Sequence, residues 1–314
     1  MSIESYVQRF QKLRVNPRGG GFSPHKPCML LAVLELAEAG ALIGNRVLFS
    51  PPLLERYRSL FDAVRAEGDH PNPYFPFFHL RGDGFWHLRP LAGQEAVLAS
   101  MKTARSLADI EQTIAYAYLD EELHTLLLEA VPREVLRESL ISRWFPEKRE
   151  RVLGVLNHEQ TVGQYELQLR GLMEGNDVRL EPRSYGEKIR SSAFRRTVLE
   201  AYDYRCAASG WRIILPDGQV MAEAAHLIPF SESGDDDPRN GIALAPSYHW
   251  ALDRNLIAPG PDLRWHVSKM LDSRVRDNAA LLDLDGKHVL FPANARYRPR
   301  EDALSYRLEH LRDA

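Results

Sequence analysis

Residues 223–253 constrain this chain more than any other segment, because they fix the order and spacing of several polar side chains. His226 comes first, Asn240 follows with a glycine after it, and His249 and Asp253 close the series. His249 and Asp253 are four residues apart, so on a helix they share one face and are close enough to bind one cation. Phosphodiester hydrolysis at neutral pH needs a base and a cation, and this segment offers both.

The local sequence predicts a ββα arrangement for the same segment. Residues 220–228 read as a strand that is closed by Pro229, which cannot donate to a β-ladder. Residues 231–241 consist largely of Ser, Gly, Asp, Pro and Asn, which is typical of an exposed loop and turn. Residues 242–244 form a short second strand, and a helix begins at 246–247. The metal site is therefore expected on the helix that follows a hairpin.

The segment resembles the HNH, or ββα-metal, endonucleases, in the subgroup with the motif Ala-Ala-His-Ile-x-Pro, Asn-Gly-x-x-Leu, His-x-x-x-Asp. The resemblance implies that His226 is the general base, and that Asn240 holds the hairpin loop and orients that base. It implies that His249 is a metal ligand and that Asp253 is a further ligand or orients the site. One divalent ion, Mg²⁺ or Mn²⁺, is the implied cofactor.

Two departures from that family pattern concern metal ions. The residue before the base is often a metal ligand in the family, and here it is Ala225. Strand alternation puts Glu223 on the same face as residue 225, so Glu223 is the candidate replacement ligand. Related hairpins often bind zinc through two Cys-x-x-Cys pairs, but this chain has only Cys28 and Cys206. No structural four-thiolate zinc site is therefore expected.

A basic segment precedes the hairpin. Residues 183–212 contain seven Lys and Arg against three Asp and Glu, a local balance of +4, although the whole chain has a formal net charge of -3. Residues 192–202 predict an amphipathic helix with its apolar side facing inward. Its arginines are expected to face outward and to contact phosphates, and the candidates are Arg190, Arg195 and Arg196. An ordinary solvated helix face is the alternative interpretation.

The first 145 residues predict a separate, helix-rich α+β unit. Helices are expected over 3–15, 28–40, 53–64, 107–118 and 121–144, and paired strands over 72–80 and 84–88. A Pro-His-Lys-Pro sequence leads into the helix at 28–40, where helix-terminal amides and a cation favour an anion. The aromatic and proline cluster at 71–79 exceeds what one face of a strand buries, which favours a pocket lined by rings; core packing is the alternative.

These two motifs resemble the sulfur-binding domain of McrA-type phosphorothioate-dependent restriction endonucleases. The resemblance implies that His25 and Lys26 contact the modified phosphate and that Phe75, Pro76 and His79 form the wall of a sulfur pocket. Sulfur is larger and more polarizable than oxygen and accepts hydrogen bonds poorly, so an apolar wall favours it. The sequence leaves open whether Tyr74 or Phe75 meets the sulfur. Groove or phosphate contacts are assigned to two further residues, Arg18 and Arg81.

The expected organisation is α+β with two domains, each long enough to bury its own core. The predicted sulfur-binding domain spans residues 1–145, a linker spans 146–182 and the nuclease domain spans 183–314. Residues 148–174 are either a helix or a connector, and 176–184 are expected to form a flexible joint. Residues 256–268 predict a further hairpin, and the chain is expected to end in a helix suited to docking or dimer contact.

Composition favours a cytoplasmic protein that does not associate with membranes. The chain has two distant cysteines, no apolar run long enough to span a bilayer and no signal-like start. The sequence thus predicts an endonuclease acting on phosphorothioated double-stranded DNA, as a homodimer because both strands must be cut. One alternative is a nuclease that reads methylated or hydroxymethylated cytosine. The other, favoured by Ala225, is a catalytically inactive HNH-fold DNA-binding protein.

Overall fold

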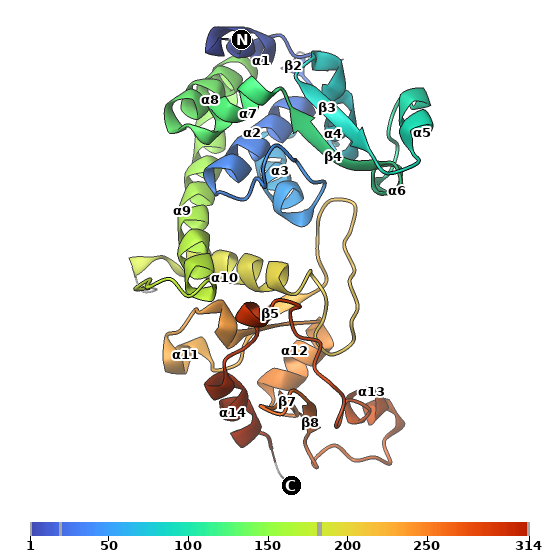
Figure 1. Ribbon diagram of the computed structural model, residues 1–314, viewed down its shortest axis with the longest axis vertical. Coiled ribbons are helices and arrows are strands. Elements are labelled where there is room, and N and C mark those ends of the chain that lie inside the picture. Colours follow the sequence, from blue (N-terminus) through green and yellow to red (C-terminus); the bar gives the residue numbers. More distant parts are fainter. Residues whose placement is uncertain (1, 19–20, 181–183, 313–314) are drawn as a thin grey trace. The chain divides into compact units, whose positions relative to one another are not determined.

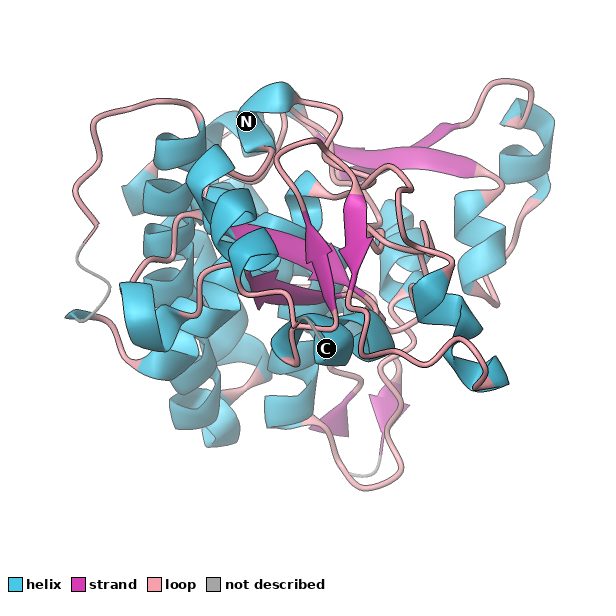
Figure 2. Ribbon diagram, turned by 90° about the horizontal axis from the view of Figure 1, so that it is seen from below, coloured by secondary structure: helices cyan, strands magenta, loops and turns pink. Residues whose placement is uncertain are grey.

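The computed structural model describes residues 2–18, 21–180 and 184–312. It divides into two compact units, Met1–Gly163 with Leu215–Gln219, and Gln164–Ile214 with Val220–Ala314. Helices predominate, and each sheet in the described part is a two-stranded antiparallel pair (Figures 1 and 2). The predicted α+β class is confirmed. In the same residues, no helix is long and apolar enough to cross a membrane.

The first unit has helices and one strand pair around a central apolar helix, α2 (His25–Glu38). Its elements are α1 (Ile3–Gln11), β1 (Pro17–Arg18), β2 (Gly21–Phe22), α2 (His25–Glu38), α3 (Pro51–Val64), α4 (Tyr74–His79), η1 (Leu80–Asp83), β3 (Trp86–Pro90), α5 (Glu95–Ser100), α6 (Leu107–Glu111), β4 (Ile114–Leu119), α7 (Glu121–Leu128), α8 (Ala130–Trp144) and η2 (Pro146–Lys148). The helix α9 (Arg149–Met173) follows and extends past the boundary between the units.

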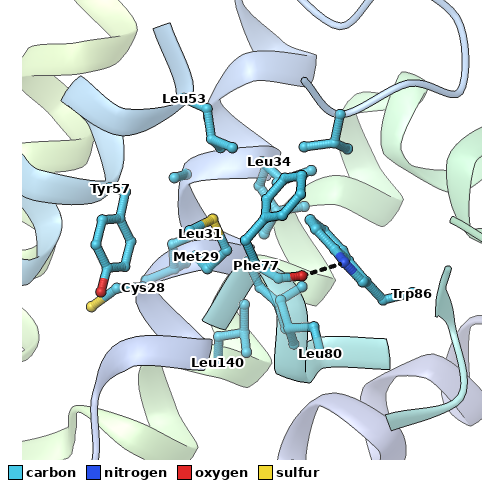
Figure 3. Packing of buried hydrophobic residues seen from close by; sticks show 14 of the residues in the cluster. Cys28, Met29, Leu31, Leu34, Leu53, Tyr57, Phe77, Leu80, Trp86 and Leu140 are labelled. Carbon is cyan, nitrogen blue, oxygen red and sulfur yellow. Dashed lines mark hydrogen bonds between the residues drawn. The ribbon is translucent and has the colours of Figure 1, made fainter. Parts of the chain in front are cut away.

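Helix α2 forms the centre of this unit because it is apolar on nearly every side, as expected of a core helix. Every residue from Pro27 to Ala37 is buried. Figure 3 shows Met29, Leu31 and Leu34 of α2 among aromatic and aliphatic side chains from other elements. The buried indole of Trp86 donates to the carbonyl oxygen of Phe77 at 2.9 Å, which satisfies its only polar atom (Figure 3).

The strand pair predicted for residues 72–80 and 84–88 is wrong. Residues 74–79 form the helix α4, in which Pro76 is the third residue and its missing N–H has no intrahelical partner to lose. Strand β3 pairs instead with β4, with Trp86 opposite Leu119. The helix predicted over 107–118 accordingly ends at Glu111, and the alternating residues after it form β4.

The second unit carries the predicted hairpin. After the end of α9, its elements are α10 (Glu187–Ala201), β5 (Glu223–His226), α11 (Phe230–Ser233), η4 (Pro238–Asn240), β6 (Gly241–Leu244), α12 (Pro246–Asp253), β7 (Ile257–Pro259), β8 (Trp265–Val267), η5 (Arg276–Asn278), α13 (Ala279–Leu282), η6 (Ala295–Tyr297) and α14 (Glu301–Glu309). The predicted second hairpin and terminal helix are confirmed. Most of the predicted linker is the helix α9, and residues 181–183 of the predicted joint lie outside the described residues.

Candidate functional site

The hairpin β5–β6 places the candidate base at the end of a strand. The strands are antiparallel, with His226 opposite Gly241 and Glu223 opposite Leu244. Helix α12 packs against both strands and carries His249. The predicted ββα arrangement is therefore present, although the first strand is limited to four residues.

Gly241 allows helix α10 to pack directly against the hairpin backbone. Its φ of -123° and ψ of 152° are ordinary extended values, so the glycine is not needed for a turn. A Cβ atom at this position would lie 2.6 Å from Cγ2 of Val198 and 2.8 Å from Cζ of Phe194. The Asn-Gly pair thus serves close packing of α10 on the strand, and not the turn geometry that its composition suggests.

Asn240 holds the loop that connects the two strands. It is fully buried, its Oδ1 accepts from the amide of Ile228 at 2.8 Å, and its Nδ2 donates to the carbonyl oxygens of Ile228 at 3.0 Å and Asp235 at 3.2 Å. The predicted role in holding the loop agrees with these bonds. The amide does not touch the ring of His226, so any orientation of the base by Asn240 is indirect.

The ring of His226 is fixed by two residues from other elements. It lies on the ring of Phe194 with centroids 3.8 Å apart and planes inclined by 2°. Its Nε2 is 3.0 Å from Oδ1 of Asp236, a fully buried carboxylate. No atom in the described part of the chain hydrogen-bonds its Nδ1, and 21% of the side chain is exposed. Asp236 was not anticipated from the sequence, which places it in an exposed loop.

Two of the predicted phosphate contacts are directed inward. The Nη1 atom of Arg190 lies 2.8 Å from Oδ1 of Asp236, and Nη1 of Arg196 lies 3.2 Å from Oε1 of Glu166. Both guanidinium groups are mostly buried, so the expectation that they face outward is wrong. The amphipathic pattern cannot reveal this, because the acidic partners lie on other elements. Arg195 stays a predicted phosphate contact.

Glu223, His249 and Asp253 come together on the α12 side of the hairpin. Oε2 of Glu223 lies 2.7 Å from Nδ1 of His249, and Oδ2 of Asp253 lies 3.5 Å from its Nε2. In residues 2–18, 21–180 and 184–312, no group of three or more His, Cys, Asp or Glu side chains has the spacing of a formed metal site. The three side chains are nevertheless oxygen and nitrogen donors suited to a divalent ion.

The distances separate the roles of the two carboxylates. Two ligands of one ion are about 3.0–3.4 Å apart when each bond is about 2.1 Å long, so the gap between His249 and Asp253 fits an ion. The distance of 2.7 Å between Oε2 of Glu223 and Nδ1 of His249 is that of a hydrogen bond, and it involves the other ring nitrogen. Glu223 as placed is therefore not a ligand that shares an ion with Nε2 of His249, contrary to the sequence prediction. It fits the carboxylate that orients a ligating histidine.

Arg307 of α14 joins the strand of the candidate base to the helix of the candidate ligand. Its Nη2 donates to the carbonyl oxygen of His226 at 2.9 Å, and its Nη1 donates to the carbonyl oxygen of Leu252 at 3.3 Å and to Oδ1 of Asn255 at 2.9 Å. The side chain is buried, and burial lowers the pKa of its guanidinium from the usual value. This residue was not predicted from the sequence, and within the described part no hydrogen bond joins His226 to His249.

In the first unit, the residues assigned to the modified phosphate have partners of their own. Nδ1 of His25 lies 2.8 Å from Oγ of Ser23 and its Nε2 lies 2.9 Å from the carbonyl oxygen of His70. The ammonium group of Lys26 lies 2.6 Å from Oδ2 of Asp83, and both side chains are largely buried. Asp83, which the sequence analysis missed, therefore neutralises the cation at the start of α2.

The aromatic residues of α4 divide between the core and the surface. Pro76, Phe77 and Phe78 are buried, whereas Tyr74, Phe75 and His79 are only partly covered. The rings of Phe75 and His79, one helical turn apart, are stacked with centroids 6.4 Å apart. The hydroxyl of Tyr74 donates a hydrogen bond to Oδ1 of Asn72 at 3.1 Å. Burial, and then Lys26 and Arg81, lower the pKa of His79 from its usual value, which favours the neutral ring.

Arg81 is bonded to the residue that follows the helix α5. Its Nη2 donates to the carbonyl oxygen of Met101 at 2.5 Å, and its guanidinium carbon is 3.9 Å from the ring centroid of Phe78. Burial lowers the pKa of this guanidinium. The guanidinium group that is predicted to contact a groove or a phosphate therefore already has partners within the chain. The side chain of Arg18 lies outside the described residues.

Two family models match the chain. The model described as "HNH endonuclease" matches residues 206–258, which contain the hairpin and α12. The model described as "ScoMcrA-like, DNA sulfur-binding domain" matches residues 3–157. The chain is an HNH endonuclease with a DNA sulfur-binding domain. This pairing is that of a modification-dependent DNA endonuclease.

Solved structures with similarity to the endonuclease were also found. The sulfur-binding domain of SprMcrA complexed with phosphorothioated DNA is 22% identical, with a TM-score of 0.36, covering 50% of this chain and 96% of that one. The Type IV phosphorothioation-dependent restriction endonuclease ScoMcrA is 13% identical, with a TM-score of 0.35, covering 98% and 99%. The modification-dependent restriction endonuclease TagI is 22% identical, with a TM-score of 0.30, covering 39% of each chain. These scores are too low to add to the family matches. A comparison with curated proteins finds no match.

Proposed function

We propose that the endonuclease recognises a phosphorothioate in double-stranded DNA and hydrolyses a nearby phosphodiester, with His226 as base and one divalent ion. The observation that carries this proposal is the match of residues 3–157 to a DNA sulfur-binding domain in a chain with an HNH domain. The surface of α4 supplies the reader in this proposal, and the β5–β6 hairpin with α12 supplies the chemistry.

The surface of α4 has properties that favour sulfur over oxygen. Phe75 and His79 present stacked, partly covered rings beside buried Pro76. The lowered pKa of His79 favours an uncharged imidazole at neutral pH. Apolar and polarizable groups of this kind gain dispersion energy from sulfur, and sulfur costs less to desolvate than a phosphate oxygen. The wall therefore supports discrimination between the two atoms.

The pairing of Lys26 with Asp83 affects what this surface attracts. A free ammonium group attracts every DNA phosphate equally, so it adds affinity without discrimination. Asp83 neutralises Lys26 in the DNA-free chain, and its carboxylate is almost fully buried. An ordinary phosphate therefore gains little from this cation, which leaves the ring wall to determine the preference for sulfur.

The second unit supplies a base and a site for a cation. In the proposed reaction Nδ1 of His226, which has no partner in the described residues, takes a proton from water. His249 through Nε2 and Asp253 through Oδ2 would hold the ion, with Glu223 orienting the His249 ring. When bound, a divalent ion neutralises charge that develops on the phosphate. These carboxylates near His249 argue against the inactive alternative, which rested on Ala225.

A homodimer is part of this proposal on grounds of mechanism. One HNH site cuts one strand at a time, so a double-strand break requires two sites or two events. Two copies of the chain would also present two readers to the same duplex. Sedimentation of the endonuclease on a short modified duplex measures this stoichiometry directly.

Phe75→Ala tests the reader. We expect the variant to lose about tenfold, or about 1.4 kcal/mol, of the wild-type preference for phosphorothioated duplex, because the ring wall is removed. The measurement is equilibrium binding, without divalent ions, to duplex pools with random flanks and one central phosphorothioate or one ordinary phosphate. Thermal unfolding establishes that the variant is folded.

Tyr118→Ala is the matched control, because Tyr118 is an exposed aromatic residue of the same unit on β4. This control should retain the wild-type preference. Equal loss in both variants would remove α4 from the proposal. A wild-type chain that prefers duplexes with methylated or hydroxymethylated cytosine, and not phosphorothioate, would replace the sulfur reader with the alternative reader.

A further inference from the structure

The contact between His226 and Asp236 determines which ring nitrogen is free for chemistry. Asp236 lies after α11, is fully buried, and places Oδ1 3.0 Å from Nε2 of the histidine. A carboxylate that is buried to this degree is costly unless its charge is compensated. The groups around Asp236 therefore decide whether it is charged, and its charge decides which way the hydrogen bond runs.

Asp236 has a cation and a hydroxyl group as partners. Nη1 of Arg190 lies 2.8 Å from Oδ1 and 3.0 Å from Oδ2, and the hydroxyl of Tyr165 donates to Oδ2 at 3.2 Å. Burial and the neighbouring Asp236 raise the pKa of Tyr165, so its hydroxyl keeps its proton. Arg190 is held in turn by Phe230, whose ring centroid is 3.4 Å from the guanidinium carbon. Asp236 is therefore an acceptor in its contacts with both groups.

An acceptor-only carboxylate fixes the tautomer of its neighbour. Nε2 of His226 must donate to Asp236, which leaves the lone pair of the neutral ring on Nδ1. The stack on Phe194 fixes the ring plane, so the lone pair of Nδ1 points in one fixed direction. Arg307 contacts the same residue only at its backbone oxygen. Among the described residues, the charged group that bonds the ring is Asp236, which in turn bonds Arg190.

We propose that Asp236 is a positioning residue, which keeps His226 in the tautomer whose Nδ1 removes a proton from the attacking water. The proposal rests on the proposed function, in which His226 is the base. In the step, the water proton passes to Nδ1 while the water oxygen forms a bond to phosphorus. The bond to the leaving oxygen breaks, and that oxygen takes a proton from solvent. Asp236 lies beside the ring where positive charge then develops.

The two residues that donate to Asp236 from helices lie outside the matched nuclease segment. Tyr165 belongs to α9 and Arg190 to α10, whereas the HNH match begins at residue 206. Tyr165 is fully buried, and its ring packs on Tyr185 with centroids 4.6 Å apart. The active hairpin thus depends on residues from two helices that precede it in the chain.

Asp236→Asn in the full chain tests the proposal. We expect kcat for cleavage of DNA to fall by about 10²–10⁴-fold, with KM unchanged, because an amide no longer selects one tautomer. The second readout is the ¹⁵N spectrum of the imidazole rings, in which comparison with His226→Ala identifies His226 among the 11 histidines. The wild type should show a protonated Nε2 and a bare Nδ1, and the variant should lose that pattern.

Asp237→Asn is the matched control, because Asp237 is buried in the same loop but bonds Arg239 and Arg300. It is expected to keep the His226 spectrum and kcat even where it lowers the melting temperature. If Asp236→Asn does not fold, Tyr165→Phe removes one donor to Asp236 with little change in side-chain volume, and kcat should fall several-fold.

Cleavage by His226→Ala distinguishes failure of the proposed function from failure of the positioning role of Asp236. If His226→Ala cleaves DNA as fast as the wild type, the proposed function fails. If His226→Ala is inactive but Asp236→Asn retains wild-type kcat and spectrum, only the positioning role of Asp236 is overturned. Where Asp236→Asn is unfolded, the same result with Tyr165→Phe overturns that role.

Discussion

We expect His226→Ala to reduce the rate of DNA cleavage by about 10²–10⁴-fold, the contribution that a positioned general base makes to a proton transfer. The reason is local, because Nδ1 of His226 is the nitrogen that Asp236 leaves free. Binding of DNA by the first unit should not change, since His226 lies in the second. Cleavage and equilibrium binding are measured on the same modified DNA with Mn²⁺ or Mg²⁺.

His266→Ala is the matched control for this prediction. His266 also pairs with an aspartate, its Nε2 lying 3.0 Å from Oδ1 of Asp262, but it lies on β8 outside the proposed site. Its removal should leave cleavage within about twofold, a change of about 0.4 kcal/mol in the barrier. Equal loss in both variants, or wild-type cleavage by a His226→Ala variant that is folded by circular dichroism, would contradict the assignment of a chemical role to His226.

The second large effect is expected from Arg307→Met. The change removes a donor from the carbonyl oxygens of His226 and Leu252 and from the side chain of Asn255, although Leu252 keeps the amide of Asn255 as a donor. Each buried acceptor left without a partner costs about 1–3 kcal/mol. Relief of a buried cation, whose Nε has no partner in the described residues, offsets part of this. We therefore expect a net loss of about 2–4 kcal/mol from the stability of the second unit.

Chemical denaturation followed by the tryptophans of the second unit measures this loss. Arg276→Met, at an exposed arginine of η5, is the control and should change stability by less than about 0.5 kcal/mol. Arg307→Lys should be nearly as damaging as Arg307→Met, because an ammonium group cannot reach three acceptors as a guanidinium fork does. Wild-type stability in Arg307→Met would show that α14 does not hold His226 and α12 together.

The hairpin and its helix were predictable because their determinants are local. Proline ends the first strand, a polar loop follows, and another proline begins α12. The helix α4 was not predictable in this way, since aromatic residues favour strands and prolines usually interrupt helices. The helix tolerates its prolines because Pro73 precedes it and Pro76 lies in its first turn.

The residues that surround the candidate base were missed for a different reason. Asp236 belongs to a run of three aspartates that is typical of an exposed loop, and only one of the three is fully buried. Its burial depends on Arg190 and Tyr165, which are distant in sequence and show no local sign of the pairing. Long-range ion pairs of this kind also hold Arg196 and Lys26, both of which the sequence pattern assigns to phosphates.

The central claim concerns one atom of the substrate, and it is tested by a cleavage rate. Two pools of duplex DNA with random flanks are prepared, one with a single central phosphorothioate of each stereochemistry and one with an ordinary phosphate. Single-turnover cleavage by the full chain is then followed with Mn²⁺ or Mg²⁺ present. We expect rapid cleavage of the sulfur-containing pool, and little cleavage of the other pool or of either pool with His226→Ala. Equal cleavage of both pools by the wild-type chain would contradict the central claim.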